Sequence, residues 1–181
     1  MSTLKYAILG MLNQHDMSGY ELTKQFEQAL AEFWPARHSQ IYPELRRLHE
    51  QGLVTYQVEI SGTVLEKKVY TITEQGRQEF LEWLQTCHKM PATPKDESRL
   101  QIFFSGSLSR QQRKKLLEDQ LEQHRLRLEH LQENQKKFPC QPAPGCEDFG
   151  DYMVLMGAVM REQSTCAWLE KCLELCEENE I

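Results

Sequence analysis

The chain has 181 residues, of which 40% are hydrophobic, and a formal net charge of −6 at pH 7. A chain of this length can bury one sizeable core or two small ones, and we expect two small units. The acidic total argues against a protein that coats nucleic acid indiscriminately, although a local basic face can exist within it.

The sequence predicts neither a secretion signal nor a membrane helix. The opening stretch MSTLKYAILGML has too short an apolar run and too few basic residues for a signal, and no later run approaches the roughly 20 apolar residues that a membrane helix needs. We therefore expect a cytoplasmic protein without a membrane partner.

Six cysteines do not indicate a disulfide framework here, because such frameworks are typical of short secreted chains. Cys172 and Cys176 lie one helical turn apart and could ligate a metal. Small apolar residues facing a neighbouring helix are the favoured interpretation, so we expect free thiols, no metal and no cofactor.

Two helices are predicted at the start of the chain. Ser18 and Glu21 have the spacing of a capping box, which predicts that the second helix begins after Ser18. Apolar residues recur at helical spacing in both helices: Leu4, Ile8, Met11 and Leu12, then Leu22, Phe26, Leu30 and Phe33.

The stretch from His38 to Val54, HSQIYPELRRLHEQGLV, predicts a third helix. Its apolar face contains Ile41, Leu45 and Leu48. Pro43 is expected in the first turn, with Ser39 or Gln40 as the cap, and Gly52 ends the helix. The opposite face is polar and contains Ser39, Gln40, Pro43, Arg46 and Arg47.

A hairpin follows, and then a fourth helix. Residues 54–58 and 67–72 alternate with period two on either side of a turn at Ser61 and Gly62, which is typical of two antiparallel strands. Thr73 can cap the next helix, in which Phe80 and either Trp83 or Leu84 face inward.

Three helices, a two-stranded wing and a fourth helix make a winged helix-turn-helix, whose third helix can enter the major groove of double-stranded DNA. Ser39 and Gln40 are candidates for contacts with base edges, and Arg46 and Arg47 for contacts with phosphate or guanine. The wing supplies two further candidate cations, Lys67 and Lys68. Tyr42 of the third helix is a candidate for a phosphate contact, and its alternative role is to fix that helix to its neighbour.

A second function stays open at this point. Residues 1–85 hold eleven acidic and eight basic residues. On charge alone, a winged helix that binds another protein is therefore nearly as well supported as one that binds DNA. The basic residues nevertheless gather in the third helix and the wing. No glycine-rich phosphate loop, paired-histidine zinc helix or nucleophile turn is present, so we expect no enzyme.

Proline-rich breakers divide the chain at residues 90–94 and again at 138–145. We expect a winged domain over residues 1–90 and an antiparallel long-helix dimerisation domain over residues 95–181, so that the whole fold is mainly α. The first long helix carries a coiled-coil heptad seam that contains Leu117, Leu121, His124, Leu128, Leu131, Gln135 and Phe138. The last helix carries a second stripe, formed by Phe149, Met153, Met156, Met160, Ala167 and Leu173.

Neither long helix can bury its stripe alone. Antiparallel packing of the two helices, and of each with a partner subunit, would bury both stripes, so the pattern predicts a homodimer. The residues expected to hold the dimer together are Leu117, Leu121, Leu128, Leu131, Met153, Met156 and Met160.

The first half of the chain resembles the PadR family of bacterial transcriptional regulators. The resemblance rests on residues 9–12 (LGML), 18–22 (SGYEL), 41–54 (IYPELRRLHEQGLV) and 67–84 (KKVYTITEQGRQEFLEWL). The stretch FWPARHSQIYPEL is similar to the branch with a long C-terminal helical domain, related to virulence activators. Base preference cannot be carried over, because His38, Ser39 and Gln40 replace a glycine-containing entry and His49 stands at a frequently acidic position.

The resemblance implies a dimeric DNA-binding repressor, and a symmetric dimer should read a palindromic operator. Relatives in the family sense small aromatic molecules, and Met153, Met156, Met160 and Trp168 could line such a site. A methionine stripe is more typical of a core, so no small-molecule effector is assigned.

Overall fold

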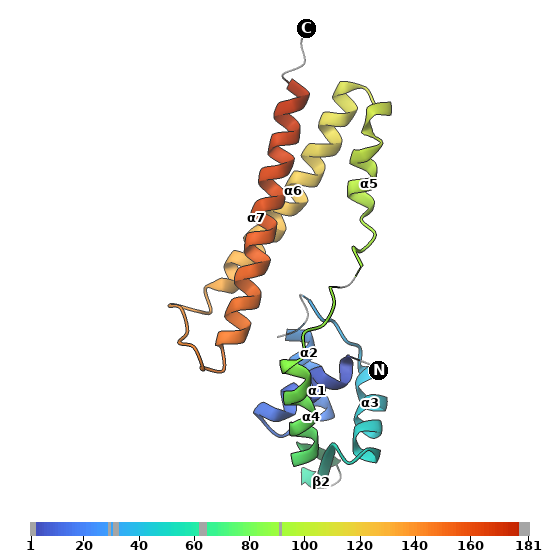
Figure 1. The fold of residues 1–181 in the computed structure, drawn as a ribbon, viewed down its shortest axis with the longest axis vertical. Helices are drawn as coiled ribbons and strands as arrows, with labels where there is room; N and C mark the ends of the chain where they lie inside the picture. The colour runs from blue at the N-terminus through green and yellow to red at the C-terminus, as the bar shows by residue number, and fades with distance from the viewer. Residues whose placement is uncertain (1–2, 29, 31–32, 62–64, 91, 178–181) are drawn as a thin grey trace. The chain divides into compact units, whose positions relative to one another are not determined.

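A computed structural model describes residues 3–28, 30, 33–61, 65–90 and 92–177. The chain divides into two compact units, Met1–Pro91 and Ala92–Ile181. The fold is mainly helical, with a winged helix-turn-helix in the first unit and two long antiparallel helices in the second (Figure 1). The predicted fold class is confirmed.

The core of the first unit joins the first three helices, α1 (Leu4–Gln14), α2 (Gly19–Gln28) and α3 (His38–Glu50). Residues at helical spacing place one apolar stripe on each helix, and three such stripes facing one another exclude water. The side chains that are no more than 1% exposed include Ile8, Leu9, Leu22, Phe26, Ile41, Leu45 and Leu48.

Helix α2 begins with the predicted capping box. The Ser18 Oγ accepts a hydrogen bond from the Glu21 N–H (3.2 Å), and the Glu21 carboxylate accepts one from the Ser18 N–H (2.8 Å). The predicted extension of this helix to Phe33 is wrong, because α2 ends at Gln28 and Leu30 packs against the core from outside it. Pro35 disfavours a helical conformation at Trp34, so it limits how far the helix could extend but does not account for its end at Gln28.

Helix α3 begins earlier than expected. The Gln40 Oε1 accepts a hydrogen bond from the Arg37 N–H (3.0 Å), so the cap is Arg37. The prediction that Ser39 or Gln40 caps the helix and that Pro43 lies in its first turn is wrong, since Pro43 lies in the second turn. The side chain of a glutamine in the first turn can accept a hydrogen bond from the backbone N–H of the residue before the helix, so the helix begins closer to the N-terminus than predicted.

The end of α3 matches its prediction. Gly52 has a φ of +72°, and the N–H groups of Gly52 and Leu53 donate to the carbonyls of His49 and Leu48, each at 3.0 Å. These are the two bonds of a Schellman motif, which glycine favours because it has no Cβ to strain a left-handed conformation.

The wing is an antiparallel hairpin of β2 (Val54–Ser61) and β3 (Leu65–Ile72). A short strand that the sequence did not predict, β1 (Met17–Ser18), pairs with the other edge of β3, so the sheet order is β1-β3-β2. Gly62, half of the predicted Ser61–Gly62 turn, lies outside the described residues.

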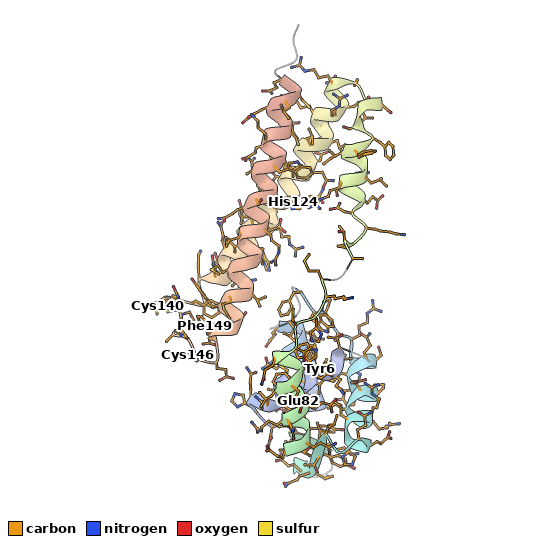
Figure 2. All side chains as sticks on the ribbon, in the orientation of Figure 1. Tyr6, Glu82, His124, Cys140, Cys146 and Phe149 are labelled. Carbon is orange, nitrogen blue, oxygen red and sulfur yellow. The ribbon has the colours of Figure 1, made fainter. Side chains whose placement is uncertain are left out.

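Helix α4 (Glu74–Gln85) closes the first unit against α1. As predicted, the Thr73 Oγ1 caps it by accepting a hydrogen bond from the Gly76 N–H (3.1 Å). Phe80 packs on the core, and Trp83 stacks on Tyr6 with ring centroids 4.7 Å apart. Figure 2 labels Tyr6 on α1, and the same view labels Glu82 on α4.

The second unit contains the short helices α5 (Glu97–Phe103) and η1 (Ser105–Ser107), followed by the long α6 (Arg110–Gln135) and α7 (Phe149–Glu177). The predicted seam of α6 packs against α7: Leu117, Leu121 and Leu131 are buried, and Leu128 is partly buried. The coiled-coil pattern therefore identifies a helical hairpin within one chain.

The face that α7 turns toward α6 contains one residue of the predicted stripe, Leu173, which is partly buried, and otherwise residues outside that stripe. Leu155, Val159, Cys166 and Leu169 are buried there, whereas the methionine stripe is exposed. At about 100° per residue, the two stripes of α7 lie about 130° apart, and both have heptad spacing. Periodicity alone could not select between them, because α7 is apolar on both faces.

Candidate functional site

A groove of about 890 Å³ lies between the start of α2, the exposed face of α3 and the wing. We call it the wing groove. Its lining combines aromatic rings with basic side chains, from three elements that only folding brings together. The lining residues are Ser18, Gly19, Tyr20, Tyr42, Arg46, His49, Tyr56, Lys67, Lys68 and Tyr70.

Tyr42 is seated in the wing groove by a glycine. A Cβ at residue 19 would lie 2.7 Å from Tyr42 Cζ, so Gly19 leaves the space that the ring occupies. The His38 ring lies 4.2 Å from the Tyr42 ring, and Tyr42 is still 39% exposed. The side chain is therefore held in place while part of it stays accessible.

The two wing lysines have different surroundings. The Lys67 ammonium lies 2.9 Å from the Glu21 carboxylate of α2. The Lys68 ammonium lies 4.2 Å from the centroid of the Tyr56 ring, a cation–π arrangement. Since neighbours along a strand point to opposite faces, one lysine faces α2 and the next faces Tyr56.

The adjacent arginines of α3 are separated in the same way. Arg46 is exposed and lines the wing groove. Arg47 forms an ion pair with Glu44, one helical turn earlier, whose side chain is 11% exposed. A step of about 100° between successive helical residues turns Arg47 out of the groove.

Ser39 and Gln40 are exposed near the start of α3 and are not among the groove-lining residues. The Gln40 side-chain carbonyl is used in the helix cap, as described above, which leaves its amide NH₂ as a donor. The structure thus brings Tyr42, Arg46, Lys67 and Lys68 together and leaves Ser39, Gln40 and Arg47 beside them.

Sequence reasoning missed six lining residues, Ser18, Gly19 and four with rings, among which Tyr20 is 72% exposed. It follows the cap and the glycine in SGYEL, so an aromatic residue at that position was the available signal. Tyr56, Tyr70 and His49 carry no such local mark. Burial raises the pKa of the Tyr70 hydroxyl, which keeps that group protonated and able to donate.

The wing groove has the composition of a site for a polyanion. Ammonium, guanidinium and tyrosine hydroxyl groups all donate hydrogen bonds to phosphate oxygens. Lys67, however, is neutralised by Glu21, whose pKa is lowered to about 2 by hydrogen bonds from Ser18 and by Lys67 itself. Arg46 and Lys68 are the cations best placed to meet a phosphate.

The residues predicted to hold a dimer fall into two groups. Leu117, Leu121, Leu128 and Leu131 pack within the chain against α7. The methionines of α7 are exposed, by 46% for Met153, 38% for Met156 and 59% for Met160. Only the methionine group has apolar surface left to offer a partner.

No group of three or more His, Cys, Asp or Glu side chains within the described residues could hold a metal ion. Cys172 and Cys176, considered above as a metal pair, pack partly buried beside Leu117 and Leu121. None of the helices in the described part of the chain is long and apolar enough to cross a membrane.

Comparison with known proteins matches both units. Residues 8–82 match the transcriptional regulator PadR-like family, and residues 94–177 match the virulence activator alpha C-terminal family. The negative transcriptional regulator PadR of Bacillus subtilis is 42% identical over 182 residues, which cover 99% of this chain and 100% of that protein.

Solved structures of Bacillus subtilis PadR agree over nearly the whole length. In complex with operator DNA, that protein superposes with a TM-score of 0.92 at 43% identity, covering 97% of this chain and 99% of the other. In complex with p-coumaric acid, it superposes with a TM-score of 0.88 at 41% identity, covering 98% and 100%.

Proposed function

This chain belongs to the PadR-like family of transcriptional regulators, a family of regulators and not of enzymes, and we propose that it is a dimeric repressor that binds a palindromic operator through the wing groove. The observation that carries this proposal is the groove itself, in which Tyr42, Arg46 and Lys68 converge from the third helix and the wing. The operator complex of the 43%-identical relative supports it.

We assign DNA binding to residues 1–90 and dimerisation to residues 95–181. Within the first domain, Tyr20, Tyr42, Arg46 and Lys68 contact the DNA backbone, because these donor-bearing side chains line the wing groove. Ser39 and Gln40 lie nearest the start of α3, where side chains of a recognition helix reach base edges. A regulator of this kind works in the cytoplasm, where its operator is.

The operator and the residue roles are tested together by selecting bound genomic fragments with the purified protein. We expect inverted half-sites one or two helical turns apart, with affinity that falls steeply as salt rises. Gln40→Ala should change sequence preference more than total affinity. Absence of salt-dependent enrichment would instead favour a winged helix that binds protein.

Arg46→Ala and Arg47→Ala form a matched pair on one helix. Loss of a guanine contact costs about 1–3 kcal/mol at one base pair, whereas loss of a phosphate contact weakens all sequences alike. We expect the larger loss for Arg46, which lines the wing groove, and a smaller one for Arg47, which is paired with Glu44. If both variants bind the operator as tightly as the wild type does, the assignment of α3 as the recognition helix is wrong.

Dimerisation is supported by the apolar surface that α7 leaves exposed at Met153, Met156 and Met160. Truncation after Met90 should leave a monomer, which engages one half-site at a time and loses about a hundredfold in operator affinity. Sedimentation and DNA titration measure both. A truncated protein that is still dimeric at micromolar concentration would contradict this assignment.

We further propose that a phenolic acid releases this repressor from its operator. The support is the relative of known structure bound to p-coumaric acid, which is 41% identical over almost all of this chain. Adding p-coumaric acid to the protein–operator complex should lower operator affinity, while its methyl ester serves as the uncharged control. An operator affinity unchanged by p-coumaric acid would exclude this ligand.

A further inference from the structure

Glu21 uses both of its carboxylate oxygens. Oε2 accepts hydrogen bonds from the N–H and from the Oγ of Ser18, each at 2.8 Å, and Oε1 accepts one from the Lys67 ammonium at 2.9 Å. The first two bonds are local and close the start of α2. The third joins α2 to the wing, between residues 46 positions apart in the chain.

The position of Lys67 on β3 gives that third bond a mechanical role. Strand β1 pairs with β3 only at Met17–Tyr70 and Ser18–Val69. Lys67 lies two residues beyond the last of these pairs, toward the tip of the hairpin. The ion pair therefore extends the connection between the helices and the wing past the point where backbone pairing with β1 stops.

Glu21 and Lys67 form an ion pair at ordinary pH. With a pKa of about 2, the Glu21 carboxylate is charged at any pH at which the protein would work. The side chains of Glu21 and Lys67 are 47% and 37% exposed, so water and salt screen the pair and its contribution is small.

We propose that Glu21 is a positioning residue for DNA binding, which through Lys67 holds the wing at the distance from α3 that a DNA backbone requires. This inference rests on the proposed function of the wing groove. It divides the two wing lysines by role: Lys68 contacts phosphate, and Lys67 sets where Lys68 lies.

The test is a double-mutant cycle on operator affinity, measured over a range of salt concentrations with the DNA fragment selected by the wild-type protein. Glu21→Gln is well matched, because glutamine preserves the capping acceptor for Ser18 and removes only the charge. Lys67→Met preserves most of the side-chain stem. The double variant has the same net charge as the wild type, so it removes the pair without changing the overall field.

Each single variant should weaken operator binding by up to about fivefold, the range of an exposed ion pair. The double variant should bind no more weakly than the weaker single variant, and its salt slope should equal that of the wild type. Lys68→Gln, the matched control on the next residue, should instead reduce the slope by about one. Thermal unfolding of each variant verifies that the fold is retained.

Two results would overturn the inference while leaving the proposed function intact. Additive losses in the double variant would mean that Glu21 and Lys67 act independently. A slope reduced by about one in Lys67→Met, together with tighter binding by Glu21→Gln, would mean that Lys67 contacts phosphate directly and Glu21 competes with the DNA. If the wild-type protein selects no operator, the proposed function fails first and this inference fails with it.

Discussion

The two units of the chain solve the problem of burying apolar surface in opposite ways. In the first, short helices and the sheet surround one core, whose central side chains, such as Phe26 and Ile41, are almost completely buried. In the second, two long helices share a single seam, and α7 leaves a whole methionine stripe exposed. The first unit is closed, whereas the second has apolar surface available for a partner.

The seam of the second unit is also interrupted by charge. Its buried residues form two clusters, one around Leu117 and one around Leu131. Between them the His124 Nδ1 lies 2.6 Å and the Arg127 Nε 3.1 Å from the carboxylate of Glu162, whose side chain is 15% exposed. Figure 2 labels His124 between the two long helices. A polar layer of this kind fixes the register of two helices at some cost in stability.

The largest expected effect contrasts one glycine from each unit. A Cβ at Gly76 would lie 2.1 Å from the backbone carbonyl oxygen of Leu53, whereas a Cβ at Gly157 in α7 meets only the end of the flexible Arg161 side chain, at 3.4 Å. Gly76→Ala should lower the free energy of unfolding by at least about 3 kcal/mol. Gly157→Ala should raise it by about 0.5–1 kcal/mol, because alanine is the better helix former.

Chemical denaturation of both glycine variants measures this difference. Equal stability of the Gly76→Ala variant and the wild type would show that the first unit is not closed around α4 as described.

The second prediction concerns the α6–α7 seam. Leu131 is fully buried between the helices, and Leu126 on the same helix is 57% exposed. Leu131→Ala should therefore cost about 3 kcal/mol of unfolding free energy, within the 2–5 kcal/mol usual for buried leucines. Leu126→Ala should change it by less than about 0.5 kcal/mol if that position faces water in the dimer as well. Similar costs at the two positions would mean that the partner covers Leu126.

The third prediction concerns the open face of α7. Met156→Glu combined with Met160→Glu should weaken dimerisation by at least about tenfold, or about 1.4 kcal/mol, because carboxylates in an apolar interface lose hydration without gaining a partner. Gln123→Glu, on an exposed position of α6 outside the methionine stripe, is the control for added charge. Analytical ultracentrifugation gives the dissociation constants, and unchanged values would exclude the methionine stripe as the dimer contact.

The smallest expected effect on stability is a dependence on pH in the first unit. The pKa of Glu21 is about 2 in the folded protein against an ordinary value of 4.5, so its stabilising contribution is present above about pH 4.5 and is lost as the pH falls toward 2. Because the side chain is 47% exposed, we expect no more than about 1 kcal/mol. Acid titrations of stability should show a shallower loss for Glu21→Gln than for the wild type.

Thiol reactivity sharpens the comparison inside the second unit without affecting its stability. Cys140 and Cys146 are exposed in the segment that joins α6 to α7, where Figure 2 labels both. Cys166 is buried in the seam, and burial, with the nearby carboxylates of Glu162 and Glu170, raises the pKa of its thiol. Labelling with a thiol reagent should modify the two exposed cysteines first. Equal rates would mean that the seam opens on the timescale of labelling.

Most features that depend on a few neighbouring residues were predicted from the sequence, the exception being the cap of α3 at Arg37. The capping box of Ser18 and Glu21, the cap at Thr73 and the left-handed Gly52 each involve groups within a few residues of one another. The seam of α6 was also predicted, because that helix has only one apolar stripe to bury. In such cases the local free energy and the tertiary packing favour the same conformation.

The tertiary structure decided between alternatives that local sequence patterns support equally well. Both stripes of α7 have heptad spacing, and only packing on α6 selected the one with Leu155 and Leu169. The separate environments of Arg46 and Arg47, and the pairing of Lys67 with Glu21, likewise depend on contacts between elements. A helical wheel or a strand alternation pattern predicts the direction in which a side chain points. It does not predict which residue that side chain contacts, because the folding of the rest of the chain brings that residue there.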